Sequence, residues 1–180
     1  MARDSKASKS TKQSASKTAS ASPAALIAPE HAAFLVPGVS VIAASRDARL
    51  VPSVSRGVAC RVSEDRRSLI VLLRRTPAAT VLRDIADSGW ITTCHSQPST
   101  HRTIQLKGRD ARIEAPGPQD IALAQAFVDG FFAELQPMGY TEAFVRTVLF
   151  FTPEDLVAVR FTPTEIYSQT PGPNAGQRLA

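Results

Sequence analysis

The chain of 180 residues has little cysteine, and it lacks the short motifs of the common nucleotide and metal sites. Cys60 and Cys94 are its two cysteines; they form no CxxC pair, and no metal-ligand spacing is present, so we predict no disulfide framework and no metal site. The sequence has no Gly-rich GxGxxG or Walker loop, which argues against dinucleotide-binding and P-loop folds. We interpret both cysteines as buried free thiols, as expected for a protein of the reducing cytoplasm.

Long apolar runs are also missing, so we predict no membrane-spanning segment and no secretory signal. Residues 1–22 are basic, Ser-rich and poor in acids, a composition that also occurs in transit peptides. A solubilising or weakly nucleic-acid-adhesive tail is the simpler interpretation. We expect a disordered basic tail over residues 1–24, one domain over 25–172 and a C-terminal tail over 173–180.

Acidic residues are scarce at the start of the chain, and this explains the net charge of +5. Residues 1–22 contain five basic residues against Asp4, which gives +4 and leaves 5 − 4 = +1 for all the rest. A nucleic-acid-binding domain would carry its positive charge on the folded body. We therefore predict no specific nucleic-acid partner.

What the chain does contain is a series of short β-rich segments with few helices between them. Strands are expected over 39–45, 50–62 (with a bulge at Gly57), 68–73, 90–95, 102–114 and 156–169 (with a bend or an edge at Pro163). Helices are expected over 29–36, 76–87, 119–136 and 141–151. This order lacks βαβ alternation and predicts a mainly β protein, an antiparallel, Greek-key-like β-barrel with helical insertions.

Three clusters of basic and polar residues fall at the ends of predicted strands. The clusters are Ser53, Ser55, Arg56 and Arg61; then Arg74, Arg75 and Thr76; then Thr100, Arg102, Thr103, Gln105 and Lys107. Guanidinium groups, hydroxyls and a helix N-terminus are the groups that bind phosphate. The second cluster is the best single candidate, because two arginines meet the dipole of a helix that Thr76 is expected to cap. Solvated surface is the alternative interpretation for each cluster.

The segment 103–107 alternates strictly, with Ile104 and Leu106 on one face and polar side chains on the other. His95 and His101 lie beside it; each is either a haem ligand, a group that polarises a carbonyl, or a polar residue of a turn. No acid is placed to orient either histidine, and no residue stands out as a general acid or base. The catalytic residues are therefore not predicted.

Three segments carry a resemblance to a known family: PSVSRGVACRV (52–62), SLIVLLRRTPAATVLRDIADSGWITTCHSQPSTHRTIQLKG (68–108) and FTPTEIYSQTPGP (161–173). They resemble the flavin split-barrel family, the pyridoxamine 5'-phosphate oxidase-like FMN-binding proteins. The resemblance implies a split β-barrel with a helical cover that binds FMN, a homodimer with flavins at the subunit interface, and a flavin-dependent oxidoreductase of unidentified substrate. The apolar helical insert, rich in phenylalanine over 127–151, is consistent with a buried partner surface.

The resemblance also implies the cofactor-binding residues. Basic residues on the second strand (Arg56 or Arg61) and around the third (Arg74, Arg75 and Thr76) would hold the FMN phosphate. The strand after the helix (Arg102, Thr103, Gln105 and Lys107) would offer polar groups to the flavin ring. The family's Ser-Arg-Lys-like phosphate grip is replaced here by residues 77–80, PAAT, and the pyridoxal-phosphate specificity pattern is absent. A non-catalytic module for a flavin, haem or deazaflavin, and an interaction protein with a degenerate site, stay open as alternatives.

Overall fold

The structure is a computed structural model that describes residues 27–180, so the predicted tail over 1–24 lies outside the described residues. The strands are β1 (Ser40–Arg46), β2 (Pro52–Val62), β3 (Leu69–Arg74), β4 (Ile91–Ser96), β5 (Thr103–Gly108), β6 (Arg112–Glu114), β7 (Leu156–Phe161) and β8 (Glu165–Ser168). The helices are α1 (Pro29–Phe34), α2 (Ala79–Ser88), α3 (Pro118–Leu135) and α4 (Glu142–Val148), with short 3₁₀ turns η1 (Gln136–Met138) and η2 (Pro153–Asp155).

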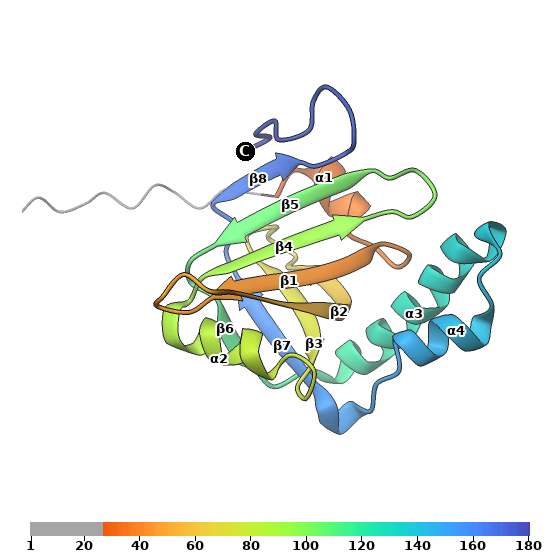
Figure 1. Cartoon of the computed structure of the whole chain (residues 1–180), viewed down its shortest axis with the longest axis horizontal. Helices are drawn as coiled ribbons and strands as arrows, with labels where there is room; N and C mark the ends of the chain where they lie inside the picture. The colour runs from red at the N-terminus through yellow and green to blue at the C-terminus, as the bar shows by residue number, and fades with distance from the viewer. Residues whose placement is uncertain (1–26) are drawn as a thin grey trace, which may run out of the picture.

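All eight strands belong to one antiparallel sheet, in the order β6-β7-β3-β2-β1-β4-β5-β8. The sheet curls, so that β1, β4 and β5 lie in front while β3 and β7 cross behind them (Figure 1). The two edge strands, β6 and β8, do not pair with each other, and the curled sheet is open along this seam. The prediction of a mainly β, antiparallel barrel with helical insertions is confirmed.

Alternation gives the front strands an inner and an outer side. In β1, Val41 and Ala43 are buried in the core, while Ile42 and Ala44 are half-exposed on the outside. β3 differs, because every residue from Leu69 to Leu73 is fully buried. Its continuous apolar run is typical of a strand that is covered on both faces.

A bulge in β2 decides which of its side chains point outward. The pairing of β2 with β3 shifts between Gly57 and Ala59, as expected for Gly57. A Cβ atom on Gly57 would lie 2.8 Å from Cγ1 of Val41, so only glycine fits there without a shift. Because the bulge adds one residue, Arg56 and Arg61 both point out of the barrel although they are five positions apart.

Three expected element boundaries were wrong. The expected strand over 102–114 is divided into β5 and β6, since the chain turns after Gly108, where a Cβ atom would lie 2.5 Å from the Phe161 ring. The final strand is divided into β7 and β8, and the break contains Pro163, where a bend or an edge was expected. Helix α2 begins at Ala79 with Ala78 as its N-cap, so Thr76 does not cap it.

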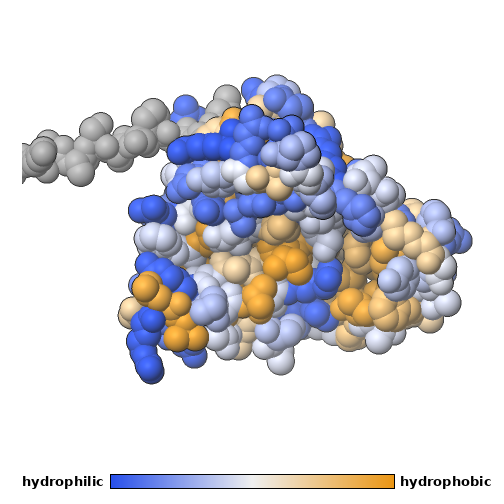
Figure 2. Space-filling view, turned by 45° about the horizontal axis from the view of Figure 1, so that its top comes forward, coloured by the Kyte–Doolittle hydropathy of each residue, from blue (hydrophilic) through white to orange (hydrophobic). Residues whose placement is uncertain are grey.

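Helices α3 and α4 form a hairpin that projects from the side of the barrel (Figure 1). The expected apolar face of α3 is confirmed at Ala124 and Phe127, which join the barrel core, and at Val128, which joins Val145 and Leu149 in a second small cluster. Figure 2 shows hydrophobic residues gathered over this hairpin. Its exposed large apolar residues are Ile121, Met138, Tyr140, Phe144, Val148 and Phe150.

The C-terminal residues run along β8, where the backbone N–H of Leu179 donates to the carbonyl oxygen of Ile166 over 2.7 Å. None of the helices within residues 27–180 has the length and apolar character required to span a bilayer.

Candidate functional site

The half-exposed side chains of β2, β1, β4, β5 and β8 form one continuous surface, here called the outer face. Cross-strand pairing arranges these side chains in rows. One row is Arg56, Ile42, Cys94, Gln105 and Tyr167, and the next is Val54, Ala44, Thr92, Lys107 and Glu165. Figure 1 looks onto this face, and no described helix lies in front of β1, β4 and β5. The side chains of Ala44, Thr92 and Cys94 at its centre are small.

Arg56 and Arg74 lie next to each other at the β2 edge of the outer face. Gly57 pairs with Leu73, and this register sets the two arginines opposite one another on adjacent strands. Within residues 27–180, neither arginine forms an ion pair with a carboxylate. Burial, and after it the charge of Arg74, lower the pKa of Arg56. Two adjacent, partly desolvated cations without a counter-charge are a site for an anion.

Both arginines keep N–H groups available for a ligand. Arg56 donates from Nη1 to Oγ of Ser40 over 2.9 Å, and its guanidinium carbon lies 6.0 Å from the centre of the Phe131 ring. Arg74 donates from Nη1 to the carbonyl oxygen of Phe150 over 2.9 Å, and its Nε is buried without a partner. A guanidinium has five N–H donors, so these contacts leave several for an anion. Phe131 and Phe150 make the α3–α4 hairpin one wall of this site.

Arg61, the other arginine singled out on β2, has a structural partner. Its Nε donates to Oδ1 of Asp120 over 2.7 Å, and Asp120 is fully buried at the start of α3. Burial alone would raise the pKa of Asp120, but hydrogen bonds from Arg61 and from the backbone N–H of Gly117 hold it below its usual value. This ion pair fastens α3 to β2 and neutralises Arg61.

The segment of Arg75 and Thr76 also has its polar groups occupied. The backbone N–H and the hydroxyl of Thr76 both donate to Oδ1 of Asp155, over 3.0 and 2.9 Å. The backbone N–H of Arg75 donates to the carbonyl oxygen of Asp155 over 2.6 Å. A carboxylate of the chain thus occupies the place where a phosphate was expected, although the Arg75 side chain is exposed.

The β5 residues are divided between two environments. Thr103 is buried, and its hydroxyl contacts Ser96 Oγ at 3.0 Å and the carbonyl oxygen of His101 at 3.0 Å. Arg102 lies outside the outer face, with its guanidinium carbon 4.4 Å from the centre of the Phe34 ring. The expected alternation is confirmed at the next positions, because Ile104 and Leu106 are buried.

Gln105 and Lys107 are the β5 residues that present polar groups on the outer face. Gln105 accepts one long hydrogen bond, 3.4 Å, from Nε2 of Gln169. The Lys107 ammonium group lies 4.7 Å from the centre of the Tyr167 ring and makes no ion pair in the described part of the chain. Gln105 shares its row with Arg56, with β1 and β4 between them.

The two histidines and the two cysteines have contrasting positions. His95 is fully buried inside the barrel, with Nδ1 3.6 Å from Sγ of Cys60 and Nε2 3.0 Å from the Thr93 hydroxyl. Burial lowers the pKa of His95 to about 3, and it raises the pKa of the Cys60 thiol, which stays protonated. Because His95 is fully buried, a haem cannot reach it. His101 is exposed in a turn. Cys94 was expected to be buried, but it is half-exposed on the outer face because it follows the alternation of β4.

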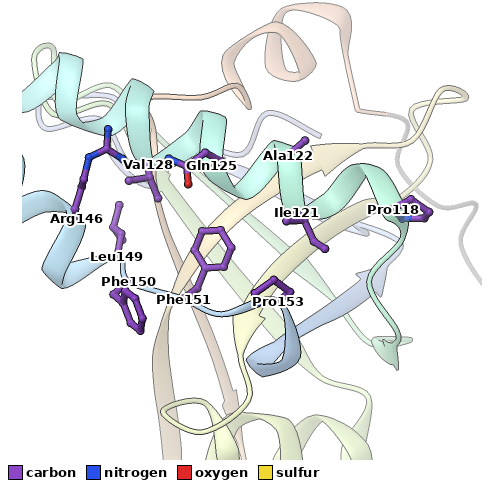
Figure 3. A pocket seen from close by; sticks show the side chains of 10 residues that line it. All are labelled: Pro118, Ile121, Ala122, Gln125, Val128, Arg146, Leu149, Phe150, Phe151 and Pro153. Carbon is purple, nitrogen blue, oxygen red and sulfur yellow. The ribbon is translucent and has the colours of Figure 1, made fainter.

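A wide apolar groove lies beside the arginine pair, between α3, α4 and η2 (Figure 3). Its volume is about 690 Å³, and Ile121, Val128, Leu149, Phe150 and Phe151 form much of its wall. Arg146 at its rim is bound to Glu142 and Asp129 over 2.7 and 2.9 Å, so it is not free for a ligand. Gln125 also lines the groove, but it donates to Oδ1 of Asp129 over 3.1 Å, so the groove offers mainly apolar surface.

Solved structures share this curled sheet. HupZ from Group A Streptococcus matches 83% of this chain and 99% of its own, with a TM-score of 0.51 and 16% sequence identity. An F420 reductase matches over 74% of this chain and 93% of its own, with a TM-score of 0.50 and 15% identity. This chain has the split-barrel fold. At such low identity the similarity shows the fold, and the chemistry has to be inferred from the outer face of this split barrel.

No protein-family model matches the sequence, and no curated protein matches it either. The split barrel is thus recognised by its strand order and curvature. Within residues 27–180 there is no group of three or more histidine, cysteine or acidic residues that could hold a metal ion.

The sequence analysis missed several residues of the site. Ser40, Ile42 and Cys94 belong to the outer face, yet each looks like an ordinary strand residue in the sequence. Alternation around the buried positions Val41 and Ala43 would have identified Ile42 as outward-facing. The adjacency of Arg56 and Arg74 depends on the β2–β3 register, which the sequence alone does not give.

Proposed function

We propose that this protein is a flavin-binding split-barrel protein of the pyridoxamine 5'-phosphate oxidase-like type, and that it acts as an FMN-dependent oxidoreductase. The observation that carries the proposal is the pair Arg56 and Arg74, two adjacent arginines without a carboxylate partner at the edge of an open sheet face. The resemblance of the sequence to FMN-binding proteins of this fold supports the same ligand.

The residues fit the parts of FMN. Arg56 and Arg74 would hold the phosphate, because guanidinium groups match phosphate oxygens with paired N–H donors. Ile42 and Ala44 offer a flat apolar floor to the ring, and Gln105 and Lys107 offer polar groups at its edge. When bound, FMN supplies the hydride or electron chemistry, and the chain positions it and excludes water.

The other predicted cofactor residues have secondary parts in this proposal. Thr103 would support the phosphate site indirectly. Its hydroxyl is hydrogen-bonded to Ser96, and Ser96 is paired with Ser40, which accepts a hydrogen bond from Arg56. Arg61 serves the ion pair with Asp120, and the Arg75–Thr76 segment is held by Asp155. Arg102 lies beyond the outer face at Phe34, and we assign no catalytic residue.

Titration of the purified protein with FMN tests the proposal. A flavin absorption spectrum after purification, or saturable quenching of flavin fluorescence, is expected for the wild-type protein. Arg56→Gln and Arg74→Gln should each weaken FMN binding at least about tenfold, because each removes charge-assisted hydrogen bonds to the phosphate. Arg112→Gln, an exposed arginine on β6, is the matched control and should bind FMN like the wild type. A protein that is colourless after purification and does not bind added FMN would refute the proposed FMN binding.

A deazaflavin is the second candidate cofactor, and the fold shared with an F420 reductase is the observation that favours it. Parallel titrations with FMN and F420 separate the two candidates by affinity. Turnover with a nicotinamide donor would then distinguish an oxidoreductase from a non-catalytic cofactor-binding module. A Soret band in the purified protein would instead indicate haem.

We also propose that the protein is a homodimer, in which a second copy covers the outer face and the α3–α4 hairpin. The hairpin exposes several large apolar side chains, among them Phe144 at 50% and Phe150 at 64%. Contiguous apolar surface of this kind on a soluble domain is typical of an interface. A partner over the outer face would exclude water from a flavin bound there.

A further inference from the structure

Away from Arg56, the outer face ends in a tryptophan held between two arginines, which we call the Trp90 stack. The guanidinium carbon of Arg46 lies 4.4 Å from the centre of the Trp90 ring, and that of Arg109 lies 4.3 Å from it. Arg46 is the last residue of β1, Trp90 precedes β4 and Arg109 follows β5. The stack therefore forms the next row of the outer face, beyond the row of Ala44, Thr92 and Lys107.

The Trp90 stack carries an excess of positive charge. A guanidinium stacked on an indole keeps its in-plane N–H groups directed sideways, where they can bind an anion. Arg46 uses one of them on the carbonyl oxygen of Asp47, over 3.1 Å. Glu165 is the acidic group beside Arg109, at 4.0 Å, and it accepts a 2.6 Å hydrogen bond from the Tyr167 hydroxyl. Among Arg46, Arg109 and Lys107, only Arg109 has a carboxylate of residues 27–180 within ion-pair distance.

Trp90 lines two hollows. One, of about 190 Å³, includes Arg46 in its lining; the other, of about 160 Å³, includes Lys107 and Arg109. Trp90 and Thr92 line both hollows, and Thr92 also belongs to the outer face. An anionic group held at the Trp90 stack can therefore extend its remaining atoms along the sheet.

We propose that the Trp90 stack binds a phosphate or carboxylate group of the substrate, while the pair Arg56 and Arg74 holds the cofactor phosphate. The two sites lie two rows apart, about 14 Å along the strands. Molecules anchored at the two ends would meet over Ala44 and Thr92. The assignment to a substrate rests on the proposed flavin function, whereas the anion site itself does not.

Trp90 makes a direct test possible, because it is the only tryptophan of the chain and its emission reports on this site alone. The full-length protein is titrated with pyrophosphate and with succinate, with sodium chloride keeping the ionic strength constant. A saturable change in Trp90 emission is expected with at least one of them. By calorimetry, Arg46→Gln and Arg109→Gln should weaken this binding at least about tenfold. Arg112→Gln, on β6, should leave it unchanged.

FMN binding measured on the same variants separates this inference from the proposed flavin function. Arg109→Gln should lose anion binding and keep wild-type FMN affinity, and Arg74→Gln should show the reverse. The anion site is refuted if neither anion binds saturably, or if Arg112→Gln weakens binding as much as Arg109→Gln. Loss of both ligands in Arg109→Gln would refute two separate sites. If the protein binds an anion but no flavin, the anion site is supported, and the proposal that the anion belongs to the substrate of a flavin-dependent reaction is refuted.

Discussion

At the scale of single residues, the arginines differ in whether a carboxylate neutralises them. Arg61, Arg146 and Arg160 have acidic partners, and these pairs hold elements of the fold together. Arg56 and Arg74 have none among residues 27–180, although both are partly buried. Keeping two adjacent cations partly desolvated costs stability unless an anion is bound. The pair is therefore best explained by a ligand.

A buried histidine makes stability depend on pH. The pKa of His95 is about 3 in the folded protein because of burial, and the ordinary value of 6.5 applies to the unfolded chain. The unfolded state therefore binds more protons between these values, and folding stability falls as the pH drops below about 6.5. At pH 4.5 the loss from His95 should be about 2–3 kcal/mol, measured by urea unfolding against pH.

His95→Asn is the control for this pH effect. Asparagine cannot titrate, and its amide can still hydrogen-bond to Thr93. The variant is expected to be less stable at pH 7.5 but to lose much less stability than the wild type between pH 6.5 and 4.5. If the free energy of unfolding changed equally with pH in both proteins over that range, His95 would not be the source of the pH dependence.

The sequence did not distinguish the roles of the candidate site residues. Arg56 and Arg74 were expected at the phosphate, and so were Arg61, Arg75 and Thr76, because all are basic or polar residues at strand ends. The partners that distinguish them lie far away along the chain: Asp120 is 59 positions from Arg61, and Asp155 is 79 positions from Thr76. Only tertiary structure brings such partners together.

At the scale of elements, strands were predictable where a local pattern determines them. Alternation identified β5 inside a longer expected strand, and a continuous apolar run identified β3. Helix α2 was expected to start at Thr76, but the contacts of Thr76 with Asp155 hold this segment outside the helix. The break after β5 depends on close packing at Gly108, which strand propensity does not report, whereas Pro163 indicated the break after β7.

The attachment of α3 to the barrel gives a prediction at this scale. Asp120→Asn removes the ion pair with Arg61 and weakens the contact of Asp120 with the Gly117 backbone N–H. Because Asp120 is fully buried while the Arg61 side chain is 27% exposed, we expect a loss of about 1–3 kcal/mol in the free energy of unfolding. Urea unfolding measures this loss.

Glu114→Gln is the matched control for Asp120→Asn. It breaks the pair of Glu114 with Arg160, in which both side chains are well exposed, at 40% and 38%. Exposed ion pairs contribute about 0–1 kcal/mol, so this variant should stay close to the wild type. If Glu114→Gln lost as much free energy of unfolding as Asp120→Asn, burial of the ion pair would not be what determines the loss.

At the scale of the whole molecule, residues 27–180 expose two adjoining surfaces that are suited to an interface with a partner. The outer face is an uncovered side of the sheet, and the α3–α4 hairpin adds exposed aromatic residues beside it (Figures 1 and 2). The resemblance to a family of homodimers predicted such a partner from the sequence. The sequence also pointed to the phenylalanine-rich insert over 127–151 as the partner surface, but not to which of its residues are exposed: Phe144 and Phe150 are, whereas Phe127 is buried in the barrel core.

The homodimer predicts a defined response to charge in the hairpin. The wild-type protein should have the mass of a dimer at micromolar concentration in light scattering coupled to gel filtration. Phe144→Glu should shift it toward a monomer, because a carboxylate buried in an apolar interface costs several kcal/mol. Leu50→Glu changes an apolar residue in the loop before β2 that is more exposed than Phe144, at 67% against 50%, and should not alter the mass. A wild-type monomer would contradict the dimer.

The central claim is that Arg56 and Arg74 bind the phosphate of a flavin. Comparing FMN with riboflavin, which is the same molecule without the phosphate, tests it most directly. By calorimetry, the wild-type protein should bind FMN about 10- to 100-fold more tightly than riboflavin, since charge-assisted hydrogen bonds to the phosphate are worth a few kcal/mol. In the Arg56→Gln, Arg74→Gln double variant the two affinities should become equal. Equal affinities in the wild type, or an FMN preference that survives in the double variant, would contradict the claim.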